Sequence, residues 1–131
     1  MTRILIVDEN TDVLRLLEVK LKSAGYETSR ARDGSEALTL AGTDQPDVIL
    51  MELLLPDTDG IELISTLKNS VNPTPIVIIL STRTADEDIH AALTSGASDY
   101  VTKPFSPQAL LERIRVNLVM TRLTAGAAEG V

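Results

Sequence analysis

The strongest constraint on the fold is a regular alternation of two kinds of segment along the chain. Five short runs have the length of strands, and four of them consist largely of apolar and β-branched residues. They are residues 3–7, 26–31, 47–51, 76–80 and 100–102. Because the apolar runs are nearly continuous, both faces of each such strand are expected to be buried, as in a central parallel strand.

Helical patterns fill the intervals between these runs. Apolar residues recur at a spacing of three to four residues in segments 11–23, 34–41, 60–68, 85–95 and 107–123. Polar residues that cap helices stand where four of these segments begin: Asp33, Asp59, Thr84 and Ser106. Glu36 follows Asp33 as in a capping box, and Pro107 suits a first helical position.

The resulting order is strand and helix five times over. Such alternation predicts a parallel sheet covered on both faces, and right-handed crossovers leave few ways to wind it. We expect a flavodoxin-like, doubly wound α/β fold in three layers, with strand order 2-1-3-4-5. Residues 1–123 suit one domain, and "TAGAAEGV" at 124–131 is expected to be a flexible tail or the start of a linker.

The amino-acid composition excludes several classes of site and partner. There are no cysteines, which excludes disulfides and thiolate zinc sites, and no apolar run approaches the ~20 residues of a membrane span. Without a signal-peptide pattern after Met1, we expect a soluble cytoplasmic protein with no membrane partner. The net charge of -7 and the absence of tryptophan argue against direct nucleic acid contact by this segment.

One residue stands out within the third apolar run. In "VILMELLLPDTDG", residues 48–60, Glu52 lies among eight residues of which the other seven are apolar. An unpaired charge in a core costs several kcal/mol, so Glu52 is expected to be paired or to lie where the strand surfaces. Ligands of open α/β sheets bind outside the carboxyl ends of the strands, which is where Glu52 would emerge.

Other polar residues follow strands at the same expected edge. They are Asp8-Glu9, Ser81-Thr82 and Lys103-Pro104. Three carboxylates brought together need a cation, and their hard oxygen atoms suit Mg²⁺, expected here to bind weakly. A hydroxyl and a lysine opposite them suit the oxygens of a phosphoryl group. Taken singly, the same residues could be helix caps or solvated side chains, and His90 is expected to have a surface or packing role.

The residues around these positions identify a resemblance to a known family. The motifs are "ILIVDEN", "PDVILMELLLPDTDGIEL", "PIVIILST" and "GASDYVTKPF", in that order. From Arg3 to about Leu123 the chain resembles the receiver domain of bacterial two-component response regulators. The resemblance implies a signalling module rather than an enzyme.

The resemblance also implies roles for individual residues. Asp8 and Glu9 match the acidic pair that holds Mg²⁺, Ser81 the hydroxyl that bonds the phosphoryl group, and Lys103 the lysine that contacts its oxygens. Tyr100 matches the switch aromatic, and the bond between Lys103 and Pro104 matches one that is usually cis. Thr82 falls where the family generally has a smaller residue.

Glu52 departs from the family, which carries the phosphate-accepting aspartate at this position. Glutamate keeps the charge but is longer by one methylene, and in-line phosphoryl transfer depends mostly on positioning. The departure predicts operation without phosphorylation, with the domain either biased toward its active-like state or held inactive. The alternative is residual phosphotransfer on Glu52 or on Asp57 or Asp59 nearby.

The expected output is a protein surface formed by the fourth helix, fifth strand and fifth helix. It would include Asp86 to Ala92, Tyr100 and Glu112 to Arg115. Its partners would be an effector domain or protein, or a second copy of the chain, with a histidine kinase or phosphotransfer protein upstream. Two other classes fit less well: phosphohydrolases generally carry D-x-D where this chain has Asn10 as the third residue, and no glycine-rich nucleotide loop follows any strand.

Overall fold

A computed structural model of the chain describes the backbone of residues 1–129 and the side chains of residues 1–124. Five parallel strands form one sheet in the order β2-β1-β3-β4-β5, which confirms the predicted flavodoxin-like topology. The strands are β1 (Arg3–Val7), β2 (Glu27–Ala31), β3 (Val48–Met51), β4 (Ile76–Ser81) and β5 (Asp99–Thr102). The helices are α1 (Thr11–Ser23), α2 (Gly34–Asp44), α3 (Gly60–Ser70), α4 (Asp86–Thr94) and α5 (Pro107–Glu129).

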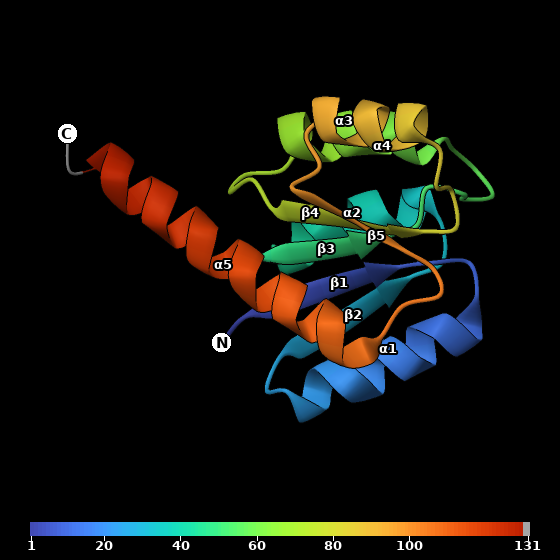
Figure 1. Cartoon of the computed structure of the whole chain (residues 1–131), viewed down its shortest axis with the longest axis horizontal. Helices are drawn as coiled ribbons and strands as arrows, with labels where there is room; N and C mark the ends of the chain where they lie inside the picture. Colours follow the sequence, from blue (N-terminus) through green and yellow to red (C-terminus); the bar gives the residue numbers. More distant parts are fainter. Residues whose placement is uncertain (130–131) are drawn as a thin grey trace.

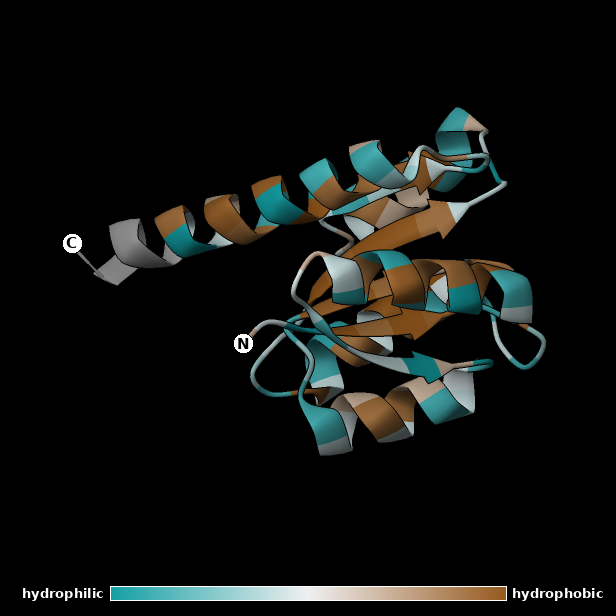
Figure 2. Ribbon diagram, turned by 90° about the horizontal axis from the view of Figure 1, so that it is seen from below, coloured by the Kyte–Doolittle hydropathy of each residue, from teal (hydrophilic) through white to brown (hydrophobic). Residues whose placement is uncertain are grey.

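Helices cover both faces of the sheet (Figure 1). Alternate residues of β1 show the division, since Ile4 and Ile6 pack with α1 and α5 whereas Leu5 and Val7 pack with α2, α3 and α4. All four of these side chains are buried. Figure 2 shows the central strands as apolar and the helices as mixed, which is the pattern that a doubly covered parallel sheet requires.

Side-chain caps begin most of the helices as the sequence predicts. Asp33 accepts a hydrogen bond from the Glu36 amide at 2.8 Å, and Asp59 accepts one from Ile61 at 2.8 Å. The prediction for Thr84 is wrong. Helix α4 begins at Asp86 with Ala85 as its N-cap and no side-chain cap, so Thr84 lies one residue too early to reach the free amides.

Helix α5 continues farther than the sequence pattern predicts. The backbone of residues 124–129 is helical, so the change to a flexible tail expected after Leu123 is not seen there. The alanine-rich composition favours continuation, because adding a residue to an existing helix needs no new nucleus. Residues 130–131 lie outside the described part, and the domain boundary at residue 123 stays a prediction. The later part of α5 projects beyond the sheet (Figure 1).

The turn after β3 is tightly packed and fixes the direction in which the chain leaves the sheet. The Gly60 amide donates to the Leu53 carbonyl at 3.0 Å, and a Cβ at Gly60 would lie 2.5 Å from the Leu53 Cα. Leu54 and Asp59 form an antiparallel bridge across the same turn. Residues 53–59 therefore form a compact loop directly beyond Glu52. Among the described residues, no helix is both long and apolar enough to cross a membrane.

Candidate functional site

The parallel register brings the ends of the central strands to one edge of the sheet. Val7 pairs with Met51, so the residues that follow them, Asp8 and Glu52, leave the sheet at the same level. The partner of Ser81 is Thr102, and Lys103 follows directly. Three charged residues that are far apart in the sequence thus emerge side by side.

Lys103 bridges the two carboxylates. Its Nζ lies 2.6 Å from Asp8 Oδ2 and 3.2 Å from Glu52 Oε1. Asp8 is only 5% exposed and Glu52 only 6% exposed, so both carboxylates depend on protein groups for compensation. Glu52 is therefore neither an unpaired charge in the core nor a solvated one, because it forms a buried ion pair with Lys103 where β3 ends.

Backbone amides engage the remaining carboxylate oxygens. Asp8 Oδ1 accepts a hydrogen bond from the Asn10 amide at 2.8 Å. Glu52 Oε2 accepts one from the Leu53 amide at 2.7 Å and a longer one from the Leu54 amide at 3.4 Å. Every oxygen of the two carboxylates thus accepts at least one hydrogen bond from the chain itself, which compensates for the burial of these charges.

The environment favours the charged form of Lys103. Burial alone would lower its pKa, but the hydrogen bonds and negative charges of Asp8 and Glu52 outweigh this effect and raise the pKa above its ordinary value. The lysine is consequently a fixed cation at neutral pH.

The hydroxyl groups near this edge do not join the ionic cluster. Ser81 is fully buried, and its Oγ accepts a hydrogen bond from the Arg83 amide at 3.2 Å. The half-buried Tyr100 donates its hydroxyl to the Arg83 carbonyl at 2.6 Å, and burial raises the pKa of its phenol. Within the described residues no hydrogen bond links Ser81 to Glu52, and Thr82 is exposed. The backbone of Arg83 therefore connects the two hydroxyl-bearing residues.

The predicted trio of metal ligands is not assembled. Glu9 is exposed, and the described residues contain no group of three or more acidic, histidine or cysteine side chains able to hold a metal. Asp8 and Glu52 have the hard oxygens that Mg²⁺ prefers, but these oxygens already bind Lys103 and backbone amides. As arranged, the residues fit a magnesium ion poorly, because it would have to compete with Lys103 for both carboxylates.

Two further acids in the loop after Glu52 have structural partners. Asp57 accepts hydrogen bonds from the amides of Gly34 at 2.8 Å and Ser35 at 3.0 Å, at the start of α2. The Gly34 bond is the main reason that the pKa of Asp57 lies below its ordinary value. Asp59 caps α3.

The peptide bond between Lys103 and Pro104 is cis, as the family resemblance implies.

Sequence reasoning missed the donors that complete the cluster. The amides of Leu53 and Leu54 leave no signal in the sequence, because every non-proline residue carries the same group. The same holds for the Asn10 amide, although the side chain of Asn10 could have been identified as the N-cap of α1, since a cap-type residue directly before an amphipathic segment is a helix-start signal.

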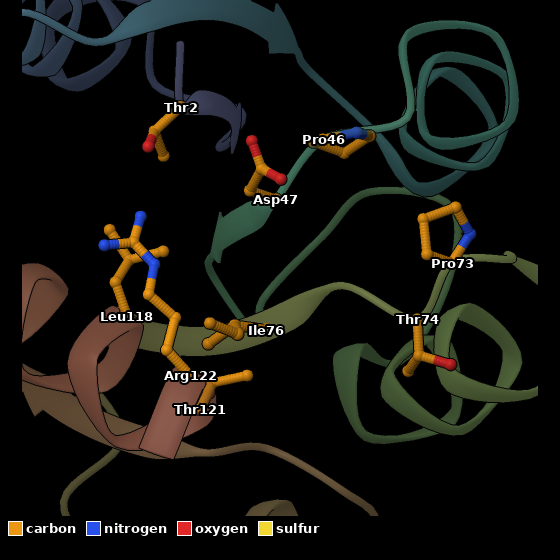
Figure 3. A pocket seen from close by; sticks show the side chains of 9 residues that line it. All are labelled: Thr2, Pro46, Asp47, Pro73, Thr74, Ile76, Leu118, Thr121 and Arg122. Carbon is orange, nitrogen blue, oxygen red and sulfur yellow. The ribbon is translucent and has the colours of Figure 1, made fainter. Parts of the chain in front are cut away.

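A separate cavity of about 210 Å³ lies away from this cluster (Figure 3). It is lined by Thr2, Pro46, Asp47, Pro73, Thr74, Ile76, Leu118, Thr121 and Arg122. These residues include none of those predicted to form the functional site. They come from the amino-terminal ends of strands and from the later part of α5, so the cavity lies at the other end of the sheet.

Comparison with known proteins decides the family. The profile of the response regulator receiver domain matches residues 4–115. The chain belongs to this family. It is thus a receiver domain of two-component response regulators, as its motifs suggested.

Relatives and solved structures agree with this assignment. The receiver domain is 36% identical over 127 residues to the alkaline phosphatase synthesis transcriptional regulatory protein PhoP of Bacillus subtilis, covering 97% of this chain and 52% of that protein. It is 40% identical over 127 residues to the transcriptional regulatory protein KdpE of Mycobacterium tuberculosis, covering 97% and 54%. The chain therefore spans about half the length of these curated relatives.

The fold comparison gives the same result. A CheY-like receiver domain protein from Methanospirillum hungatei superposes with a TM-score of 0.89 at 30% identity, covering 95% of this chain and 98% of that one. The receiver domain of Francisella response regulator 1452 gives a TM-score of 0.85 at 35% identity, covering 92% and 99%.

Proposed function

We propose that this receiver domain regulates a partner through protein contacts without being phosphorylated at residue 52. By the family resemblance, Glu52 matches the phosphate-accepting aspartate. The observation that carries the proposal is the engagement of its carboxylate by Lys103 and by the amides of Leu53 and Leu54. A nucleophile held by these donors and longer by one methylene is poorly placed for in-line attack, where a displacement of about 1 Å can lower the rate roughly a hundredfold.

The other acids near the site support the same proposal. Phosphotransfer to Asp57 would break its hydrogen bonds to the start of α2, and phosphotransfer to Asp59 would remove the cap of α3. Each carboxylate already has a structural partner, so neither is a free nucleophile. Residual phosphotransfer in the loop is therefore the weaker alternative.

Glu52 also does not imitate a phosphoryl group through Ser81. Its negative charge faces Lys103 and the end of its own strand, whereas Ser81 bonds the Arg83 amide. We propose a domain held in one state by the ionic cluster, instead of one driven toward the active-like state by a contact between Glu52 and Ser81.

The proposed output surface is formed by α4, β5 and α5. Arg113 holds β5 against α5 through two hydrogen bonds to Asp99 at 2.8 and 2.5 Å. Ala92 and Ile114, which the sequence placed within this surface, are fully buried and so cannot contact a partner directly. The candidate partners are a second copy of the chain or an output domain. Since relatives are named transcriptional regulatory proteins, we propose an output domain that controls transcription.

Intact mass measurement after incubation with acetyl phosphate and Mg²⁺ tests the proposal. The wild-type protein and the control Glu62→Asp, which shortens an exposed acid on α3 outside the site, are expected to keep their mass. The variant Glu52→Asp is expected to gain one phosphoryl group, because it restores the family's acceptor. A phosphoryl gain by the wild-type protein would contradict the proposal.

A further inference from the structure

We infer that the Lys103 ammonium is the resident cation of this acidic pocket and excludes Mg²⁺ from it. The inference deepens the proposed function and rests on it for its meaning in signalling. Magnesium binding and phosphorylation are nevertheless measured separately. The basis is the ionic cluster itself, in which one ammonium contacts both buried carboxylates.

Occupancy of the oxygen atoms is the first reason. Mg²⁺ requires near-octahedral oxygen coordination at about 2.0–2.1 Å and dehydrates reluctantly. To coordinate Asp8 Oδ2 or Glu52 Oε1 directly, it would have to compete with the ammonium that already contacts both atoms. It would then leave a lysine that is only 15% exposed beside a divalent cation, an arrangement of like charges in a poorly solvated place.

The shape of the donor set is the second reason. A third carboxylate would help to offset this repulsion, but Glu9 is exposed and stands apart from the pair. Asp8 and Glu52 carry two negative charges, of which the lysine already neutralises one. The attraction left for a divalent cation is therefore small.

The length of the Glu52 side chain allows its carboxylate to contact Lys103 and the backbone at the same time. One of its oxygens reaches Lys103 while the other returns to the amides of Leu53 and Leu54 at the end of its own strand. An aspartate has one methylene fewer with which to satisfy both sets of donors. We therefore expect Glu52→Asp to loosen the lysine contact and to admit Mg²⁺.

Calorimetric titration with MgCl₂ at constant ionic strength tests the inference, with thermal unfolding as a second measurement. The wild-type protein is expected to show no saturable heat and no Mg²⁺-specific rise in melting temperature up to about 10 mM. The matched control Lys22→Met removes an exposed lysine that pairs with Glu18 on α1, and it should behave like the wild type.

Lys103→Met should bind Mg²⁺ at least roughly tenfold more tightly than the wild type, because a unit positive charge in contact with both carboxylates is gone. Glu52→Asp should likewise bind Mg²⁺ more tightly than the wild type does. If Lys103→Met folds only when Mg²⁺ is added, that result supports the inference as well.

Saturable Mg²⁺ binding by the wild-type protein at or below about 10 mM would overturn the inference, as would a folded Lys103→Met variant that gains no affinity. If Lys103→Met does not fold under any condition, the MgCl₂ titration of the wild-type protein alone tests the inference: saturable binding overturns it, and no binding supports it. The two proposals fail separately: a wild type that binds Mg²⁺ but keeps its mass with acetyl phosphate overturns only the inference. A wild type that is phosphorylated contradicts the proposed function whatever its Mg²⁺ affinity.

Discussion

Replacement of Lys103 by methionine measures how far the folded state depends on the ionic cluster. Methionine fills a similar volume but carries no charge, so Lys103→Met leaves two buried carboxylates without their shared cation. Removing one member of a buried ion pair usually costs about 3–5 kcal/mol. Here the Lys103 side chain is 15% exposed, and three backbone hydrogen bonds to the carboxylates remain. We therefore expect a loss of about 2–4 kcal/mol in the free energy of unfolding at pH 7.

Urea unfolding followed by far-ultraviolet circular dichroism measures this loss, since the chain has no tryptophan to serve as a fluorescent probe. The control Lys22→Met removes an exposed lysine and should change the free energy by less than about 0.5 kcal/mol. A loss below about 1 kcal/mol for Lys103→Met would refute the reasoning, because the carboxylates would then have adequate compensation without the lysine.

The pH dependence of the free energy of unfolding supplies a second test of the contribution of Lys103. Because the folded state raises the pKa of Lys103, its contribution to stability is fully present below the unfolded-state pKa of about 10.4. It is lost as the pH rises through the higher folded-state pKa. The difference between wild type and Lys103→Met should accordingly stay constant from neutral pH to about pH 10 and shrink above it.

Three further substitutions test the surroundings of the cluster. Gly60→Ala should lower the free energy of unfolding, measured by urea titration, by roughly 1–3 kcal/mol, because the new Cβ would lie 2.5 Å from the Leu53 Cα. An unchanged urea midpoint would contradict the tight packing of this turn. Asp57→Asn should lower the melting temperature at neutral pH. Because the pKa of Asp57 is lowered in the folded state, its contribution is present above the ordinary pKa of 3.8 and is lost as the pH falls through the folded-state value, so the two proteins should converge in acid. Tyr100→Phe should cost about 0.5–1.5 kcal/mol by removing the hydrogen bond to the Arg83 carbonyl, and hydrogen exchange in the loop after β4 should become faster; unchanged exchange would mean that the phenol does not hold that loop.

Much of the fold could be predicted because its signals are local. Nearly continuous apolar runs indicate strands that are buried on both faces, and cap residues such as Asp33 and Asp59 mark where helices begin. Where the structure differs from the local pattern, the causes are local as well. Helix α4 begins one residue later than the cap residue Thr84 suggests, and the backbone of residues 124–129, an alanine-rich stretch without an apolar pattern, is helical.

The candidate site could be predicted as a group of residues but not as a network. The strand ends indicated that Asp8, Glu52 and Lys103 would meet, since parallel strands deliver their carboxyl ends to one edge. The same reasoning added Glu9, whose side chain is exposed, and Ser81, which instead bonds the Arg83 amide. Which neighbouring group a polar side chain chooses depends on its rotamer and on distances that sequence spacing does not contain.

By itself the sequence determined a doubly wound sheet with a glutamate at its polar edge, because burial on both faces and strand order follow from residue pattern and chain connectivity. Only the tertiary structure decided what that glutamate binds. Lys103 lies 51 positions farther along the chain than Glu52, and two backbone amides compete for the same carboxylate. Such a choice depends on ångström-scale distances between elements, and these are fixed only when the helices and strands have packed together.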